Sequence, residues 1–346
     1  MSAILFSAFA VIALVIVAFL GVAAADLRVL FGIVVPYAAV VTFFVGVVYR
    51  VMKWARSPVP FRIPTTAGQE KSLPWIKSNK IDNPSSTGGV ILRMLLEVFL
   101  FRSLFRNTKM EYHQGPVIRY GSAKWLWLFG LLFHWSFLVV LIRHLRFFTL
   151  NVPVWVQGIE KLDSFLEIGL PIITPWGGLE MGLPLLYQSG VVLLTFATLL
   201  FLRRVVVPQV RYISLASDYF PLFLIIGISL TGIIMRYLTK VDVVAVKKLT
   251  MSLVSFHPAL PPDQIGSLFY VHLFLVSFLF AYFPFSKLMH MGGVWLSPTR
   301  NLANNSRVKR HINPWNPEVH FHTYQEYEDD FREQMIEAGI PVEKEA

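Results

Sequence analysis

The chain has 346 residues, of which 55% are hydrophobic and only 15% are charged, and it contains no cysteine. This composition argues against a soluble domain, and the lack of thiols excludes disulfides and cysteine-ligated zinc or iron–sulphur centres within the chain. The net charge is +10, but most basic residues flank apolar segments. We therefore predict that the charge orients a membrane protein, and we predict no nucleic-acid partner.

Several apolar segments are long enough to cross a lipid bilayer, for which about 20 apolar residues are needed. The predicted spans lie at about 3–25, 29–52, 124–148, 184–202, 218–238 and 267–291. The first segment has no basic region before it and is followed at once by the second, so we interpret the two as a retained helical hairpin, not a signal peptide. The predicted fold is an all-α polytopic membrane bundle of about six transmembrane helices.

The connections between the spans differ in their basic residues. Lys and Arg concentrate in the long connection before residue 124, in the 203–217 loop and at the start of the tail. These parts and both termini are therefore predicted to be cytoplasmic, in a multi-pass protein of the cytoplasmic (inner) membrane. The 239–266 loop fits least well, because it must be external although it carries three lysines.

Two segments outside the spans show helical patterns. Gly89–Lys109 has apolar residues at helical spacing with three arginines among them, which predicts an amphipathic helix in the membrane interface. Thr323–Gly339 is acidic and is followed by Pro341, which predicts a short soluble helix that ends at Gly339.

The chain has nine histidines, and four of them lie in predicted spans. His134 and His144 lie on the third span, and His272 and His290 lie on the sixth. An imidazole inside a membrane helix is costly and is a functional candidate by default. Because the two spans run in opposite directions, depth pairs His144 with His272 toward the external side and His134 with His290 toward the cytoplasm. Each pair can supply bis-imidazole ligation to the iron of one haem b.

The spacing of the histidines tests this hypothesis. Ten helical residues rise about 15 Å and eighteen rise about 27 Å, so the two pairs do not match in depth. We expect a kink at Pro284 to absorb part of the difference. The alternative is a haem-free membrane transporter or scaffold that uses its intramembrane histidines for proton relay. The sequence shows no repeated halves of the kind that many transporters have.

These intervals resemble the cytochrome b subunit of respiratory nitrate reductase, the gamma-subunit superfamily, in which histidines ten and eighteen apart ligate two b haems in crossed order. The resemblance covers roughly Lys124 to His290. The two leading spans, the long tail and the stretch PFSKLMHMGGVWLSPTRN resemble the DsrM branch, the membrane cytochrome b of the sulphite-reduction-associated (Dsr) transmembrane electron-transport complex. The similar heterodisulfide reductase cytochrome b of methanogens stays open as an alternative.

The resemblance implies two haem b cofactors and menaquinone or menaquinol as substrate, with menaquinol oxidation favoured. It further implies a cytoplasmic iron–sulphur subunit of heterodisulfide-reductase type, and further membrane and periplasmic redox subunits, within sulphur metabolism and sulfate reduction. The chain is thus expected to be a redox subunit of a quinol-oxidising complex and not a stand-alone enzyme. We divide it into an N-terminal transmembrane hairpin (1–52), a basic cytoplasmic connection with the interfacial helix (53–120), a four-helix dihaem core (121–296) and a cytoplasmic tail (297–346).

Further candidate residues follow from the charges that these cofactors carry. Haem propionates are anionic and need basic partners. The candidates are Arg143 and Arg146 for the external haem, Arg119, Lys124 and Lys287 for the cytoplasmic haem, and Arg236 for either. By the resemblance, the quinone lies beside the external haem, where a residue that accepts protons near neutral pH is needed. The quinone candidates are His257, Lys240, Asp242 and Glu180. We find no nucleophile triad and predict no catalytic residue.

Overall fold

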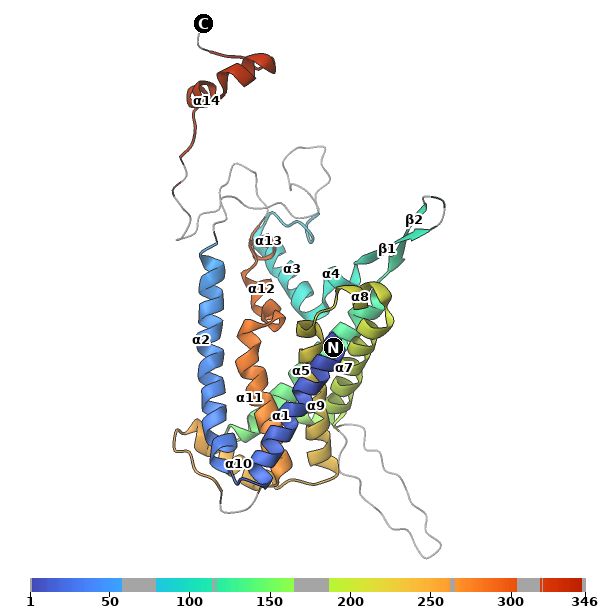
Figure 1. Cartoon of the computed structure of the whole chain (residues 1–346), viewed down its shortest axis with the longest axis vertical. Helices are drawn as coiled ribbons and strands as arrows, with labels where there is room; N and C mark the ends of the chain where they lie inside the picture. Colours follow the sequence, from blue (N-terminus) through green and yellow to red (C-terminus); the bar gives the residue numbers. More distant parts are fainter. Residues whose placement is uncertain are drawn as a thin grey trace, which may run out of the picture.

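The structure is a computed structural model that describes residues 2–57, 79–113, 115, 117–164, 187–261, 265–303, 318 and 320–343. Within these ranges the chain is mostly helical, and its long helices form one bundle (Figure 1). Its spans are α1 (Ala3–Ala23), η1 (Leu30–Val34) continued by α2 (Val35–Ala55), α5 (Lys124–His144) with η2 (Leu145–Phe147), α7 (Gln188–Val206), α9 (Ala216–Tyr237) and α11 (Ser267–Tyr282) with η3 (Phe283–Phe285). The described part of the chain thus contains six helices that could cross a membrane, which confirms the predicted bundle.

The helices pack side by side in an order that leaves α5 and α11 apart. α5 packs on α7, α7 on α9, and α9 on α1 and α11, while α11 also packs on α1 and α2. Leu193, Leu224 and Leu275 lie in the shared core. By contrast, α1 and α2 expose large apolar side chains, among them Phe9 and Phe44. Such a belt suits lipid, where backbone groups must be bonded within each helix.

The last span is shorter than predicted. We expected it to run to residue 291, but α11 gives way to the 3₁₀ turn η3 around Pro284, and Ser286 is extended with ψ 178°. The chain then forms η4 (Lys287–Met289), α12 (His290–Leu296) and α13 (Pro298–Asn301). Proline has no N–H and its ring clashes with the preceding turn, so a straight helix cannot pass through this position. His290 therefore begins a new short helix beyond the span.

The predicted amphipathic helix also ends early. α3 (Thr87–Leu100) stops at Phe101, whose φ of 50° is left-handed, and α4 (Arg102–Phe105) follows. Residues 108 and 109, expected to be helical, begin strand β1 (Thr108–His113), which pairs antiparallel with β2 (Val117–Ser122). Gly115 at the turn has φ 80°, a conformation that favours glycine. The sequence analysis did not predict this hairpin.

The remaining described helices are short and lie in the connections. They are α6 (Val154–Asp163), α8 (Pro208–Ile213), α10 (Val243–Val254) and α14 (Tyr324–Glu337). α10 fills part of the 239–266 loop and buries Ala245 and Leu249 against the bundle. α14 confirms the predicted tail helix, because Thr323 and Glu326 form a capping box at its start and Gly339 has φ 69° just beyond its end.

The two ends of the bundle need names. We call the end that carries α3, α12 and α13 the α3 end, and the opposite end, which carries α10, the α10 end (Figure 1). α5 runs from the α3 end to the α10 end, and α11 runs back.

Candidate functional site

The four candidate histidines meet in two pairs, one toward each end of the bundle. His144 on α5 faces His272 on α11, with ring centroids 6.5 Å apart and ring planes 17° apart. His134 on α5 faces His290 at the start of α12, with ring centroids 5.9 Å apart and ring planes 86° apart. The structure therefore brings together the same two pairs that depth and helix direction indicate.

The Nδ1 atoms of three of these rings are bonded within their own helical turn. They contact the carbonyl oxygens of Gly130 (from His134, 2.7 Å), Val140 (from His144, 2.7 Å) and Lys287 (from His290, 2.9 Å). A carbonyl oxygen only accepts hydrogen bonds, so Nδ1 must carry the proton. Each of these neutral rings is left with a bare Nε2, the atom that is free to ligate a metal.

The fourth ring is held from a neighbouring helix. His272 Nδ1 lies 2.8 Å from Thr231 Oγ1 on α9, and that hydroxyl oxygen lies 2.8 Å from the Gly227 carbonyl. The hydroxyl donates to the carbonyl and accepts from Nδ1–H, so His272 also presents Nε2. Gly232 sits beside it, where an added Cβ would lie 3.4 Å from His272 Cε1. The small residue lets α9 approach the ring closely.

The two pairs fit the haem iron that the sequence analysis expects. Two imidazoles on opposite sides of one metal, with metal–nitrogen distances of about 2 Å, place their ring centroids about 6 Å apart. His134, His144 and His290 are exposed although they lie among packed helices. α5 and α11, which are both described throughout, make no extensive contact of their own. The donor set, four neutral nitrogens without thiolate, suits bis-imidazole ligation of two haems.

Aromatic rings line both pairs. Phe101 and Phe133 each meet the His134 ring edge-on at 5.0 Å, and Phe147 lies 5.8 Å from the His144 ring. Phe101 reaches His134 because its left-handed backbone ends α3 beside α5. Two indole N–H groups of α5 bind the end of α3. Trp127 donates to the Leu100 carbonyl at 2.8 Å, and Trp135 donates to the Phe99 carbonyl at 3.0 Å.

A buried ion pair lies next to the pair at the α10 end. Arg143 Nη1 lies 2.5 Å from Asp163 on α6, and both side chains are largely buried. The Asp163 carboxylate also accepts from the backbone N–H and the hydroxyl of Ser189, at 2.7 and 2.6 Å. The Arg143 guanidinium stacks on the Tyr187 ring, 3.4 Å from its centroid. Arg143, a candidate partner for a haem propionate, therefore already forms an ion pair with a carboxylate of the chain.

A second acid–base pair adjoins the first. Arg146 forms an ion pair with Glu160, and the Tyr187 hydroxyl donates to the same carboxylate at 2.5 Å. Burial and the adjacent Glu160 charge raise the pKa of Tyr187, so its hydroxyl stays a donor. Arg236 lies 5.0 Å from the Tyr187 ring. The acidic members of this network were not singled out by the sequence analysis.

The basic candidates at the α3 end are spread over several elements. Lys287 forms an ion pair with Asp218 at 2.7 Å, which ties the turn before His290 to the start of α9. Lys124 lies 5.1 Å from the centroid of the Phe105 ring. Arg119 is exposed on β2. The structure does not gather these three side chains into one cluster.

The quinone candidates are also not brought together. Asp242 caps the start of α10 by accepting from the Val244 and Ala245 N–H groups, and Lys240 lies just before it with φ 47°. His257 lies beyond the other end of this helix of 12 residues. That length corresponds to about 18 Å. Glu180 lies outside the described residues.

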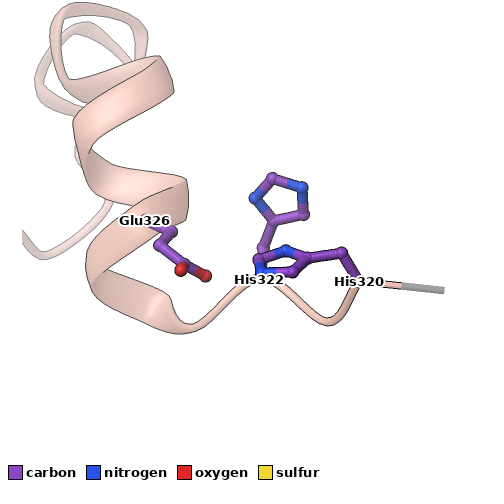
Figure 2. A group of neighbouring side chains, drawn as sticks. All are labelled: His320, His322 and Glu326. Carbon is purple, nitrogen blue, oxygen red and sulfur yellow. The ribbon is translucent and has the colours of Figure 1, made fainter.

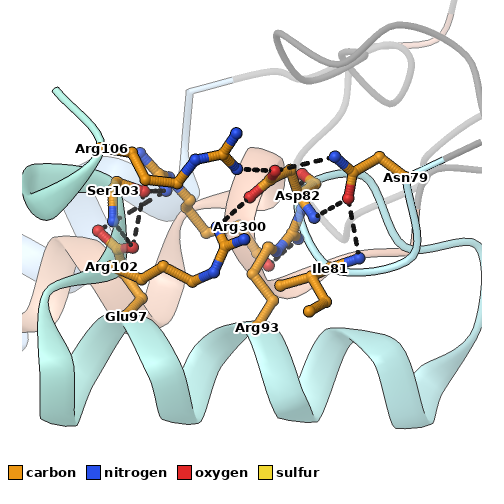
Figure 3. A network of polar contacts seen from close by, with 9 residues as sticks. All are labelled: Asn79, Ile81, Asp82, Arg93, Glu97, Arg102, Ser103, Arg106 and Arg300. Atoms are coloured by element: carbon orange, nitrogen blue, oxygen red, sulfur yellow. Dashed lines mark hydrogen bonds and ion pairs between the residues drawn. The ribbon is translucent and has the colours of Figure 1, made fainter. Parts of the chain in front are cut away.

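A polar network at the α3 end, which Figure 3 shows, was not predicted from the sequence. Asp82 pairs with Arg102 and Arg106 and accepts from Asn79. Burial acts to raise the pKa of the Asp82 carboxyl, but the hydrogen bonds and charges of these neighbours outweigh it and hold the pKa below its usual value. The network has no sequence signal, because its members come from separate turns.

The same network holds the segment that follows α12. Arg93 on α3 is buried and donates to the carbonyl oxygens of Arg300 and Leu302. The Arg300 guanidinium in turn donates to Ser103 Oγ at 2.8 Å. α3 and the short helices that begin with His290 are thus joined to each other.

Comparisons with known proteins place the chain among its relatives. The model of the nitrate reductase gamma subunit family matches residues 94–311, which include both pairs. The chain is 46% identical over 295 residues to the Hdr-like menaquinol oxidoreductase cytochrome b-like subunit of Archaeoglobus fulgidus, covering 84% of each chain. It is 43% identical over 287 residues to the protein of the same name from Archaeoglobus profundus, covering 82% of this chain and 81% of that one.

A more distant relative matches a smaller part of the chain. The respiratory nitrate reductase 1 gamma chain of Escherichia coli is 27% identical over 217 residues, which are 57% of this chain and 89% of that protein. The α1–α2 hairpin lies outside the residues that the family model matches. With a match over more than half of its length and two long, similar relatives, the chain belongs to the nitrate reductase gamma subunit family.

Proposed function

We propose that the chain is a dihaem cytochrome b, the membrane subunit of a respiratory redox complex. One haem b is held by His144 and His272 at the α10 end, and the other by His134 and His290 at the α3 end. When bound, the haems supply one-electron transfer along the bundle. The observation that carries this proposal is the paired geometry: centroid separations of 6.5 and 5.9 Å, with every Nδ1 already bonded.

The chain's own residues set the orientation and protonation of these ligands. The hydrogen bonds at Nδ1 keep each ring in the tautomer that offers Nε2, and they fix its direction. The Thr231 hydroxyl does this for His272 from a second helix, and the Lys287–Asp218 ion pair holds the turn that bears His290. The Arg143–Asp163 and Arg146–Glu160 ion pairs join α6 to the end of α5 that carries His144.

The names of the two Archaeoglobus relatives support a finer proposal. The substrate is menaquinol, oxidised near the α10 end, and the electrons pass to a cytoplasmic iron–sulphur subunit of heterodisulfide-reductase type that docks at the α3 end. In this arrangement both termini are cytoplasmic and the bundle spans the inner membrane. Further membrane and periplasmic redox subunits complete the complex. Within the family we assign the chain to the DsrM branch, which acts in sulphur metabolism.

Haem analysis of the purified chain and of histidine variants tests the proposal. We expect a pyridine haemochrome measurement to give about two haem b per chain, and about one in His134→Ala and in His272→Ala. His257→Ala is the matched control, because His257 is exposed and lies outside both pairs. A folded chain without haem would contradict the proposal and would favour a haem-free transporter or scaffold that relays protons. Haem retained in both variants would contradict the assignment of the ligands.

A further inference from the structure

A second group of possible metal ligands lies in the tail, on the stretch that leads into α14. His320, His322 and Glu326 each offer a ligand atom, and these atoms lie within 4.8 Å of one another (Figure 2). Both histidines are exposed, and their rings meet edge-on with centroids 5.3 Å apart. None of the three residues belongs to the paired histidine site. The group therefore needs an explanation of its own.

Local structure accounts for the convergence of these side chains. His320 and His322 lie two residues apart directly before Thr323, and their rings are in contact. Thr323 then starts α14, and Glu326 is the residue whose carboxylate accepts the Thr323 N–H at 2.8 Å through Oε2. This capping bond holds the Glu326 side chain back toward the histidines, as Figure 2 shows, and leaves Oε1 available.

A fourth ligand, and the second that offers oxygen, is available one turn further along α14. Asp330 follows Glu326 by four residues, so both carboxylates lie on the same face of the helix. Its Oδ2 lies 3.9 Å from His322 Nδ1. Two imidazoles with one or two carboxylates form a donor set that suits divalent transition metals such as Zn²⁺. Mg²⁺ and Ca²⁺ prefer oxygen ligands alone, so the two imidazoles select against them.

We propose that His320, His322 and Glu326, with Asp330 as a further ligand, form a site for a divalent transition metal ion in the tail. Bound metal connects the stretch before α14 to the first two turns of that helix. It also reduces the negative charge of this surface, where Glu326, Asp329 and Asp330 lie close together. The proposal does not depend on the haem assignment.

Zinc binding to the full chain tests this site. The protein is purified in detergent with an affinity tag that contains no histidine and is stripped of loosely bound metal. Zn²⁺ is then titrated against a zinc-binding dye as competitor. We compare the wild type with His320→Ala/His322→Ala, with Glu326→Gln and with His257→Ala, which removes an exposed histidine elsewhere. Glu326→Gln keeps an oxygen that can accept the capping bond, so α14 is expected to stay folded.

We expect the wild type and His257→Ala to bind one more equivalent of zinc than the double variant, and Glu326→Gln to bind it about tenfold more weakly or worse. Binding should weaken at acidic pH, because protons compete with the metal for imidazole nitrogen. The double variant should keep the haem content of the wild type, which separates this test from that of the proposed function. Equal zinc binding by the wild type and the double variant would overturn the proposal.

Discussion

The two histidine pairs are built differently, although both join α5 to the chain of the last span. At the α10 end, His272 lies within the regular part of α11, it is the most buried of the four rings, and Thr231 holds it from α9. At the α3 end, His290 lies beyond the break at Pro284 and is exposed. The hydrogen bond described for its ring is the one to the Lys287 carbonyl, within its own turn. One ligand is fixed by helix packing, and the other is fixed by a turn.

This difference explains how two unequal spacings give two matched pairs. A continuous helix from residue 272 to residue 290 would rise about 27 Å, against about 15 Å between residues 134 and 144. Instead the chain leaves α11 after Tyr282, passes through η3 and η4, and starts α12 at His290. The helix is thus interrupted between the two ligands, and both pairs still meet, with ring centroids 6.5 and 5.9 Å apart. The ring planes are 86° apart at the α3 end and 17° apart at the α10 end, so the two pairs also differ in ring orientation.

Among the variants that test this difference between the two pairs, we expect the largest effect from substitution of the histidine ligands themselves. We expect His272→Ala to lose the α10-end haem and to lower the free energy of unfolding by about 2 kcal/mol or more, because it leaves a cavity among packed helices. His290→Ala should lose the α3-end haem with a smaller loss of stability, since its ring is exposed. Haem content and thermal unfolding in detergent measure both effects.

A volume-conserving variant sharpens this prediction. His272→Leu removes the ligand but fills much of the same space, so it should lose haem while recovering part of the stability that His272→Ala loses. Equal thermal stability of His272→Ala and His290→Ala would contradict the distinction between a packed ligand and an exposed one.

The next largest effect is expected for a glycine that faces the break. Gly46 on α2 is buried against Pro284, and an added Cβ would lie 2.8 Å from Pro284 Cβ and 2.9 Å from its Cγ. Both atoms belong to a rigid ring, so Gly46→Ala must displace the turn that sets His290. We expect haem binding at the α3 end to weaken about tenfold, while the α10-end haem is retained.

Haem spectra of the oxidised protein measure the effect of Gly46→Ala on each site separately, because the two ligand pairs differ in ring angle. Gly158→Ala on α6 is the control, since an added Cβ there meets no atom within 4 Å. If Gly46→Ala disturbed only the α10-end haem, the break at Pro284 would not be what positions His290.

A smaller effect is expected from the hydrogen bond that holds His272. Thr231→Val keeps the shape of the side chain but removes the acceptor for Nδ1–H. A hydrogen-bonded imidazole is the more basic ligand and favours oxidised iron. We therefore expect the midpoint potential of the α10-end haem to rise by on the order of 30–60 mV, about tenfold or less in the equilibrium constant. Redox titration followed by absorbance measures the shift.

The matched control for this hydrogen bond is Thr198→Val. Thr198 Oγ1 donates to the Leu194 carbonyl at 2.8 Å, the same bond within a helix that Thr231 makes to Gly227, and no described hydrogen bond joins it to a histidine. A rise in potential of similar size in both variants would show that the helix bond, and not the contact with His272, is responsible.

Sequence patterns predicted the features that depend on residues close together in the chain. Apolar runs located all six spans, although the sixth was predicted to end six residues too late. Opposite helix directions predicted which histidines meet, because depth depends only on residue spacing and direction. The acidic run before Gly339 and Pro341 predicted the helix α14. These features depend on neighbouring residues alone, so one sequence is enough to predict them.

Features that join distant segments were missed for a physical reason. Nothing in the pattern around Thr231 indicates that its hydroxyl contacts a histidine 41 residues later. The left-handed Phe101 falls within an apparently continuous amphipathic run. One signal was available: Arg143 and Arg146 are three residues apart, as are Glu160 and Asp163. Two helical faces with matching spacing and opposite charge predict the ion pairs at the α10 end.

The smallest effect we predict is at Asp82, in the network that fixes the segment after α12. Asp82→Asn removes the charge that pairs with Arg102 and Arg106, and because these ion pairs are partly exposed we expect it to cost about 0.5 kcal/mol of stability at neutral pH. Because the folded-state pKa lies below the usual 3.8, this contribution is fully present above that pH and is lost as the pH falls through the folded-state value. The advantage of the wild type over Asp82→Asn in thermal unfolding should therefore disappear only in strong acid. A constant difference down to pH 2 would show that Asp82 acts through packing and not through its charge.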